Sequence, residues 1–252
     1  MVNLYIKFQT RILWFLLKMN KPISTLFMLV SVDGKISTGA INDRDTDKDY
    51  RIIKGILEGV GQYYELEKLT DRFSLNTGKV MAKIGVNTPN NPIHCPDVTF
   101  IIIDNNYLDE NGITNLCNNL KELILVTHNA NHPAFKNKCN NLKIIKYKNE
   151  IDFVDLFNKL KEQFGVGRLT IQSGGTLNSI LLRNKLIDKI SIVLVPCLIG
   201  GHDTPTLIDG ESLISKNDLK HIKVLKLEKV DILKNSFLHI QYSVKNNTEL
   251  IK

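Results

Sequence analysis

From Leu26 onward, short apolar runs of strand length alternate with longer amphipathic runs of helix length. A chain with this order buries its apolar runs in one sheet and packs the helices against it, which is the α/β arrangement. The expected strands are rich in Ile, Val and Leu and cover residues 26–31, 98–104, 122–127, 142–147, 169–172 and 189–198. No internal repeat or long linker interrupts the pattern.

Helical periodicity is expected at 47–57, 77–84, 113–120, 151–164 and 176–186. At the end of the chain, 221–230 and 236–244 alternate apolar and polar residues around the polar stretch 231–235, which is typical of an antiparallel hairpin. The sequence therefore predicts a mixed, mostly parallel sheet flanked by helices, with a C-terminal antiparallel hairpin.

The 252 residues are enough for one large domain, and we expect residues 20–246 to form it because no change of composition divides them. Residues 1–19 are expected to be an N-terminal extension. Its apolar run 12–17 is shorter than the roughly 20 residues that a membrane-spanning helix needs, and no small-residue cleavage site follows. The extension is interpreted as a surface or partner-packing helix, or as the result of a mis-assigned start upstream of Met19.

The chain carries 33 Lys and Arg against 26 Asp and Glu, a formal net charge of +7, which favours anionic ligands. These basic residues are dispersed and form no stripe interleaved with aromatic residues, so neither a nucleic acid nor a membrane partner is expected. The four cysteines form no C-x-x-C pair, which fits a reducing, cytoplasmic compartment. No metal site is expected.

The first candidate site is Asp33-Gly34-Lys35, directly after the first expected strand. An Asp-Gly pair often forms a simple turn, because Gly accepts positive φ and Asp hydrogen-bonds its own backbone. Alternatively, a carboxylate at the end of a buried strand could hold a polar ligand above the sheet, and burial could raise its pKa far enough for acid or base chemistry.

A second candidate is the segment 169–178, in which an apolar strand runs through Gly174-Gly175 into a helix. Glycine lets a phosphate approach the backbone, and the free N–H groups and dipole of the first helical turn favour an anion. A tight turn between strand and helix is the alternative. The third candidate is the Gly200-Gly201 loop after the last parallel strand, which could close over a ligand or form an ordinary bend.

Three segments together are similar to one known family: 31–36 (SVDGKI), 174–177 with 186–188, and 196–201. Their order, spacing and closing hairpin resemble the RibD C-terminal-domain family, the pyrimidine reductases of riboflavin biosynthesis with a dihydrofolate-reductase-like fold. The resemblance covers about Pro22 to Val244. It implies an NADPH-dependent homodimeric enzyme similar to 5-amino-6-(5-phosphoribosylamino)uracil reductase. Such an enzyme reduces the ribose of a phosphorylated pyrimidine substrate to a ribityl chain by hydride transfer, without a metal, and a related small substrate is the alternative acceptor.

The resemblance also implies residue roles. Asp33 takes the catalytic position beside the nicotinamide, and Lys35, Gly200 and Gly201 face the substrate. The implied cofactor-binding residues are Ser173, Gly174, Gly175, Thr176 and Leu177 for the NADPH phosphates, Thr127 and His128 for the adenosine 2′-phosphate, and Gly78 and Lys79 in the segment after the first helix.

Two positions depart from the family pattern. The family commonly carries Glu-Gly-Gly at the glycine turn, whereas Ser173 precedes Gly174 here, and the segment 74–81 matches its family counterpart only at Gly78-Lys79. These departures motivate a second hypothesis, a non-catalytic nucleotide-binding or phosphate-binding paralogue of the same fold.

Overall fold

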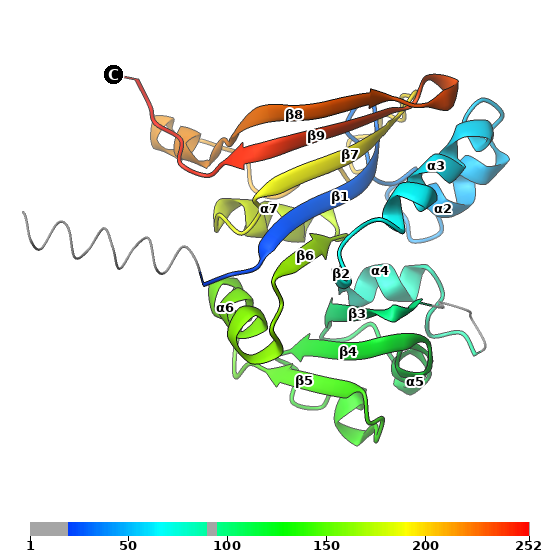
Figure 1. The fold of residues 1–252 in the computed structure, drawn as a ribbon, viewed down its shortest axis with the longest axis vertical. Coiled ribbons are helices and arrows are strands. Elements are labelled where there is room, and N and C mark those ends of the chain that lie inside the picture. Colours follow the sequence, from blue (N-terminus) through cyan, green and yellow to red (C-terminus); the bar gives the residue numbers. More distant parts are fainter. Residues whose placement is uncertain (1–19, 90–94, 252) are drawn as a thin grey trace, which may run out of the picture.

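The computed structural model describes residues 20–89 and 95–251, so the expected extension 1–19 lies outside the described residues. Within those ranges, nine strands form one sheet in the order β5-β4-β3-β2-β6-β1-β7-β9-β8 (Figure 1). The strands are β1 (Ile23–Ser31), β2 (Phe73–Thr77), β3 (Cys95–Ile103), β4 (Leu120–Thr127), β5 (Leu142–Lys146), β6 (Arg168–Ile171), β7 (Lys189–Val195), β8 (Val224–Ile232) and β9 (Leu238–Lys245). Strands β1 to β7 run parallel, and β9 is antiparallel to both β7 and β8.

The helices connect the parallel strands. They are α2 (Thr46–Asp49), α3 (Leu57–Glu67), α4 (Gly78–Lys83), α5 (Glu110–Asn119), α6 (Phe153–Phe164) and α7 (Gly175–Arg183), with short 3-10 turns at η1 (Tyr50–Ile52), η2 (Pro133–Lys136), η3 (Lys216–His221) and η4 (Lys234–Ser236). Among the described residues, every helix is too short or too polar to cross a bilayer.

The two faces of the sheet are covered differently. On one face, α6 and α7 pack against the middle strands in a single cluster that includes Leu75 and Leu156. The other face carries two separate clusters, one of α4 and α5 on β3 and β4, the other of α3 on β1 and β7. Between these two clusters, β2 and the residue after β6 present the polar side chains of Ser74, Asn76 and Gln172. The helices thus leave a polar gap over the middle of the sheet.

Helix α6 illustrates how the sequence sets an element. The Asp152 carboxylate caps it by accepting hydrogen bonds from the N–H groups of Val154 and Asp155. Gly165 ends it with a φ of 65°, a left-handed conformation that favours glycine. Between these ends the apolar residues repeat every three to four positions and bury one face, so this helix is confirmed.

The expected fold class, the parallel strands and the C-terminal hairpin are confirmed, with three differences. The segment 47–57 is not one helix, because after α2 and η1 the chain turns through Gly55 at a φ of 91° before α3 begins at Leu57. Strand β2 was not expected. Its sequence, FSLNT, is short and alternates in polarity, so it lacks the continuous apolar run of the other buried strands. Strand β7 also ends at Val195, three residues before the expected boundary.

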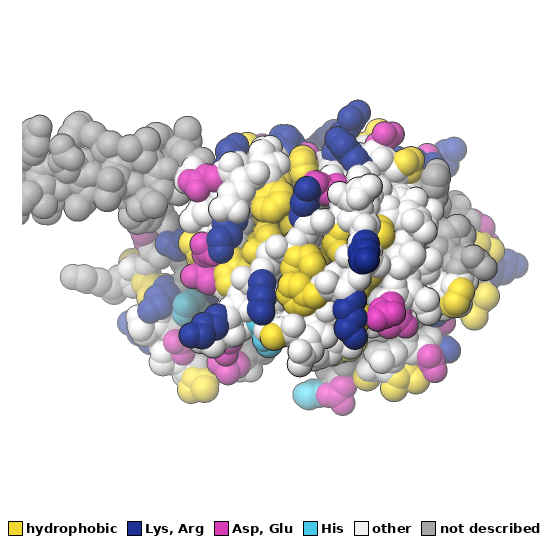
Figure 2. All heavy atoms as spheres, turned by 90° about the horizontal axis from the view of Figure 1, so that it is seen from below, with side chains coloured by type: hydrophobic (Ala, Val, Ile, Leu, Met, Phe, Trp, Pro, Cys, Tyr) yellow, Lys and Arg dark blue, Asp and Glu magenta, His cyan; other side chains and the backbone are white. Residues whose placement is uncertain are grey.

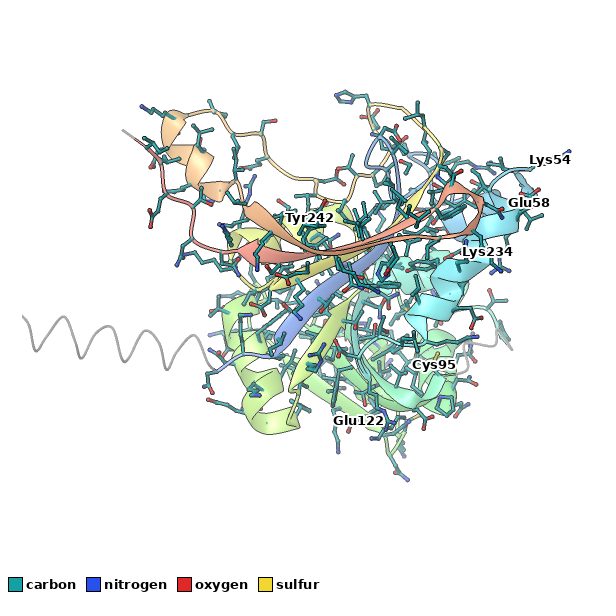
Figure 3. The ribbon with its side chains drawn as sticks, turned by 45° about the horizontal axis from the view of Figure 1, so that its top comes forward. Lys54, Glu58, Cys95, Glu122, Lys234 and Tyr242 are labelled. Atoms are coloured by element: carbon teal, nitrogen blue, oxygen red, sulfur yellow. The ribbon has the colours of Figure 1, made fainter. Side chains whose placement is uncertain are left out.

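The hairpin is tied to α3 at its tip. The side chain of Gln62 accepts a hydrogen bond from the Lys234 N–H and donates one to the Lys234 carbonyl. Lys54, Glu58 and Lys234 lie at this end of the molecule (Figure 3). The buried ring of Phe237 approaches so closely that a Cβ at Gly59 would lie 2.4 Å from it. This contact fixes α3, one wall of the polar gap, on the sheet.

We therefore expect Phe237→Ala to lower the free energy of unfolding by about 3–5 kcal/mol, because it leaves a cavity between α3 and the sheet. Urea denaturation followed by circular dichroism measures the change. Ile232→Ala, at a side chain that is 86% exposed on the neighbouring strand, is the control and should leave the midpoint nearly unchanged. Equal midpoints for the two variants would contradict this account.

Candidate functional site

A topological switch point lies between β2 and β6, which are adjacent and parallel. After β2 the chain enters α4 on one face of the sheet, and after β6 it enters α7 on the other. At such a point the two connections diverge and open a crevice at the carboxyl ends of the strands. A cavity of about 1090 Å³ occupies this crevice and extends over the polar gap. Its volume lies slightly above the range of about 300–1,000 Å³ typical of ligand pockets.

Helix α7 begins at this cavity without a side-chain cap. Gly174 is its N-cap residue and, within the described residues, no side chain bonds to its first N–H groups. A Cβ at Gly174 would meet open space, whereas one at Gly175 would lie 2.3 Å from the Thr206 carbonyl oxygen. The turn is therefore open at Gly174, whereas glycine is required at position 175 because the loop that contains Thr206 packs closely against it.

Ser173 shapes this turn from inside. It is buried, its hydroxyl donates to the Asn178 side chain, and Asn178 donates back to the Ser173 carbonyl and to that of Leu207. The cavity is lined by all five residues of this turn: Ser173, Gly174, Gly175, Thr176 and Leu177. The structure thus brings together the five residues of the expected phosphate turn.

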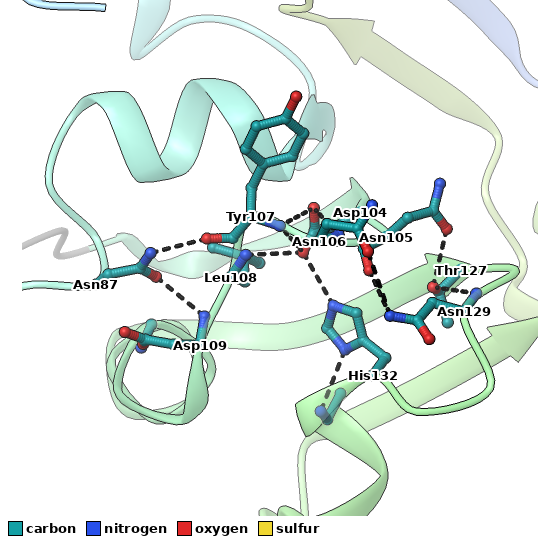
Figure 4. Close-up of polar contacts among 12 residues, drawn as sticks. Asn87, Asp104, Asn105, Asn106, Tyr107, Leu108, Asp109, Thr127, Asn129 and His132 are labelled. Atoms are coloured by element: carbon teal, nitrogen blue, oxygen red, sulfur yellow. Dashed lines mark hydrogen bonds and ion pairs between the residues drawn. The ribbon is translucent and has the colours of Figure 1, made fainter.

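A buried carboxylate, Asp104, organises the neighbouring strand end (Figure 4). It accepts hydrogen bonds from the N–H groups of Tyr107 and Leu108 and from Nε2 of buried His132, at 2.9 Å. Nδ1 of His132 accepts from the Ala134 N–H, so the ring carries its proton on Nε2. Burial alone would raise the pKa of Asp104, but these hydrogen bonds outweigh it and hold the pKa below its usual range.

Gly78 and Lys79 have separate roles at the start of α4. A Cβ at Gly78 would lie 2.2 Å from the carboxyl carbon of Asp104, so glycine is required for this close approach. Lys79 is exposed and lines the cavity, whereas Gly78 does not. Only the lysine of this expected pair faces the space where a ligand fits.

Thr127 and His128 hydrogen-bond Asn105, a residue that lines the cavity. The Thr127 hydroxyl and the His128 N–H both donate to the side-chain oxygen of Asn105, and Asn129 donates to the Asn105 carbonyl (Figure 4). Asn105, Asn106 and Tyr107 line the cavity, while Thr127 and His128 do not. The loop 105–107 was not recognised from the sequence, where its only signal is a polar run after an apolar strand.

The third group of expected residues ties two loops together. The Asp33 carboxylate accepts from the Ser31 hydroxyl at 2.5 Å and from the N–H groups of Ile199 and Gly200. The hydrogen bond from Ser31, followed by the one from Gly200, lowers the pKa of Asp33 to about 2. The Lys35 ammonium donates to the carbonyls of Gly201 and Thr204.

None of Asp33, Lys35, Gly200 or Gly201 is among the described residues that line the cavity. They lie at the same edge of the sheet as the phosphate turn, because β1 and β6 are parallel neighbours. The loop that they anchor continues to Thr206 and Asp209, which pack against Gly175. Their geometry therefore supports the turn from outside.

The floor of the cavity holds a polar group that the sequence did not reveal. Gln172 Nε2 donates to the Glu67 carboxylate at 2.5 Å, and Ser74 and Asn76 continue the chain of hydrogen bonds. Burial raises the pKa of Glu67, and it also raises that of Asp47, which accepts from the Tyr64 hydroxyl. All of these side chains line the cavity. The one available signal was the alternation Ser-Leu-Asn in β2.

Within residues 20–89 and 95–251, no three His, Cys, Asp or Glu side chains gather in a way that could hold a metal ion.

A model of the RibD C-terminal domain family matches residues 22–232. Among curated proteins, the chain is 46% identical over 59 residues to a protein of Archaeoglobus fulgidus and 34% identical over 99 residues to one of Methanothermobacter thermautotrophicus. Both are named 2,5-diamino-6-ribosylamino-4(3H)-pyrimidinone 5′-phosphate reductase. The matches cover 23% and 36% of this chain and span 27% and 42% of those relatives, less than half of their length.

Two solved structures share the fold. RibD of Acinetobacter baumannii superposes with a TM-score of 0.62 at 14% identity, over 90% of this chain and 59% of that chain. The riboflavin biosynthesis reductase Rib7 of Saccharomyces cerevisiae gives a TM-score of 0.57 at 18% identity, over 89% and 90% of the two chains.

Because Asp104 joins β3, the loop 105–107 and His132, we expect Asp104→Asn to lower the free energy of unfolding by about 2–4 kcal/mol at pH 7. A lowered pKa means that the carboxylate stabilises the fold above its ordinary value of 3.8, and that this contribution is lost as the pH falls through the lowered value. The difference in the free energy of unfolding between the wild type and the variant should therefore become smaller below about pH 4.

Urea midpoints measured from pH 7 to pH 3 provide this comparison. Asp203→Asn, at a side chain that is 82% exposed, is the control. A difference in urea midpoint between the wild type and Asp104→Asn that stays constant over this pH range, or is absent at pH 7, would contradict the role of Asp104.

Proposed function

Because the chain belongs to the RibD C-terminal domain family, we propose that it is an NADPH-dependent reductase of a ribosylamino-pyrimidine 5′-phosphate. The curated relatives are named as reductases of a ribosylamino-pyrimidinone 5′-phosphate, which supports an oxidoreductase. When bound, NADPH would supply a hydride to the sugar carbon bearing the pyrimidine nitrogen; the bond from that carbon to the ring oxygen would break, the oxygen would take a proton from solvent, and the ribosyl group would become a ribityl chain with NADP⁺ as the oxidised product. The chain's own residues bind the two reactants, orient them and exclude water.

The observation that carries the proposal is the uncapped start of α7 at the switch point. The N–H groups of Thr176 and Leu177 are those of the first helical turn, where a diphosphate is stabilised by direct hydrogen bonds and by the helix dipole. Gly174 leaves room for a phosphate, and exposed Lys79 lines the same cavity. These residues fit a dinucleotide whose phosphates lie between α4 and α7.

The adenosine end of the cofactor is assigned to the loop 105–107, which Asp104 and Asn105 hold in one conformation through their hydrogen bonds. In this proposal Thr127 and His128 position Asn105 and do not contact the 2′-phosphate through their side chains. The loop lines the cavity on the α4 side, which agrees with a cofactor that crosses the switch point from α7.

Asp33 is assigned a positioning role. Its pKa of about 2 keeps it ionised at neutral pH, so it has no proton to donate to a reacting group. Its carboxylate instead fixes the N–H groups of Ile199 and Gly200, and Lys35 fixes the next turn of the same loop. We therefore propose that Lys35, Gly200 and Gly201 support the turn at Gly175, in place of the contacts with substrate that the resemblance implies for them.

We assign the homodimer to the edge strand β8. Among the described strands it pairs with β9 alone, and it exposes the apolar side chains of Val224, Leu227, Val230 and Ile232. An exposed apolar edge is a surface on which a second copy would be buried. On the face shown in Figure 2, Lys and Arg side chains stand singly among acidic, polar and apolar ones, an arrangement that suits small anionic ligands better than a polyanion.

We expect purified protein to oxidise NADPH when a ribosylamino-pyrimidine 5′-phosphate is added, with the ribitylamino compound as product. Loss of NADPH absorbance and mass spectrometry of the product measure the reaction, and NADH serves as the cofactor control. NADPH that binds but is never oxidised across pyrimidine and pteridine substrates would favour the non-catalytic paralogue. Absence of NADPH binding would overturn both hypotheses.

We expect Gly174→Asp to raise the dissociation constant of NADPH at least about 10-fold, because the new carboxylate caps the N–H groups that the diphosphate needs. The fold should be unaffected, since Gly174 has φ −72° and ψ 157°, open to any residue, and its Cβ direction is empty. Fluorescence titration with NADPH measures the affinity.

Gly167→Asp is the matched control. Gly167 also has empty space in its Cβ direction, but it precedes β6 at the opposite end of that strand. NADPH affinity should be unchanged in this variant. If Gly174→Asp binds NADPH as tightly as Gly167→Asp does, the phosphates do not bind at α7.

A further inference from the structure

The polar floor of the cavity has a defined direction of hydrogen bonding. A carboxylate only accepts, so Glu67 requires the NH₂ group of Gln172 to point toward it. The Gln172 oxygen then accepts from the Ser74 hydroxyl at 3.0 Å, and the Ser74 oxygen accepts from the NH₂ group of Asn76 at 2.9 Å. Gln172 Nε2 also donates to the Tyr63 hydroxyl at 3.3 Å, and the hydrogen bonds of the chain run in one direction, from Asn76 through Ser74 and Gln172 to Glu67.

This direction determines what the floor offers to a ligand. The Asn76 side-chain oxygen and the second carboxylate oxygen of Glu67 have no hydrogen-bond partner among the described residues, and both residues line the cavity. Asn76 is only 4% exposed as a residue, yet among the described residues its side-chain oxygen is not a fully buried atom without a partner, so the oxygen is accessible from the cavity that Asn76 lines. A ligand N–H group that reaches it gains a hydrogen bond in a largely buried setting. The floor is therefore complementary to a ligand that presents N–H groups.

The pyrimidines of the proposed reaction differ at C2. The ring named for the curated relatives carries a 2-amino group beside its N3–H, so it presents two adjacent donors. The uracil ring that the family resemblance implies carries a carbonyl oxygen at C2, which is an acceptor. Acceptor atoms on the floor bind the two N–H donors of the 2-amino ring by hydrogen bonds, which are charge-assisted at the Glu67 carboxylate. The same acceptors repel the C2 carbonyl oxygen of the uracil ring.

We propose that Glu67 determines the substrate specificity of the cavity. Through Gln172 and Ser74 it fixes the Asn76 amide with its oxygen free to accept, and this oxygen, together with the second Glu67 oxygen, selects a 2-aminopyrimidin-4(3H)-one over the corresponding uracil. This inference rests on the proposed function for the identity of the substrate, but the hydrogen-bonding argument is independent of the cofactor. When a site hydrogen-bonds a group of its ligand, an analogue that lacks this group leaves buried polar atoms of the site unpaired, and the site rejects it strongly.

Kinetics on both substrates tests the assignment. We expect the wild type to have a kcat/KM at least about 10-fold higher for the 2,5-diamino-pyrimidinone than for the 5-aminouracil, each as its ribosylamino 5′-phosphate. Glu67→Gln removes the obligate acceptor, so each amide along the chain can reverse and present an NH₂ group to the cavity. The preference should fall at least about fivefold in this variant, with NADPH affinity unchanged.

Glu65→Gln is the matched control, because Glu65 is on the same helix, is 72% exposed at its side chain and, among the described residues, pairs with Lys68 alone. It should keep the wild-type preference. Ser74→Ala is a second variant that cuts the chain between Gln172 and Asn76 without touching Glu67, and it should also lower the preference. A wild type that prefers the uracil, or a Glu67→Gln variant with an unchanged preference, would overturn the inference.

Binding of the bare rings separates the failure of this inference from failure of the proposed function. If neither phosphorylated substrate supports NADPH oxidation, the proposed function is wrong. Calorimetric or NMR titration with 2,6-diaminopyrimidin-4(3H)-one and with 6-aminouracil, which differ at C2, still tests the floor. Tighter binding of the diamino ring that is lost in Glu67→Gln and kept in Glu65→Gln supports the role of Glu67. Equal binding of the two rings refutes it.

Discussion

The parallel pairing of β2 with β6 is the constraint on which the site depends. These strands are far apart in the sequence, yet Ser74 lies opposite Thr170 and Leu75 opposite Ile171 in the sheet. Their following helices leave on opposite faces, so the carboxyl edge opens between α4 and α7. One face of the pair is apolar and joins the main core, while the other is polar and floors the cavity. A single strand pair thus supplies both the packing of the sheet and the binding surface.

The sequence revealed the parts of the fold whose physical signal is local. Apolar runs located the six parallel strands other than β2, and α6 was visible from its 3.6-residue period between Asp152 and Gly165. Strand β2 was missed because residues that floor a cavity alternate in polarity, and five residues give too short a pattern. The helix expected at 47–57 was wrong for a similar reason: the apolar residues Ile52 and Ile53 continued the period, yet they remain exposed in a turn that Gly55 completes.

The site followed the same division. The turn from Ser173 to Leu177 was found because strand, glycine pair and helix are contiguous. The roles of Thr127 and His128 were not accessible in this way, because both act on Asn105, some 22 residues earlier, across two neighbouring strands. Asp104 and His132 are separated by 28 residues, and their contact exists only when β3 and β4 pair. Local sequence locates turns and caps, whereas these polar contacts are properties of strand pairing.

The structure explains what the serine at position 173 does in place of the glutamate that the family commonly carries. Where the family commonly carries a glutamate, the Ser173 hydroxyl is buried and bonded to Asn178, so this position sends no carboxylate into the cavity. A carboxylate reaches the cavity instead from α3, a helix that the Phe237 ring and the Gln62 side chain hold against the hairpin. Because Glu67 is connected through Gln172 to the strand end beside Ser173, the two elements act on one surface. The placement of α3 therefore controls which polar atoms the middle of the sheet presents.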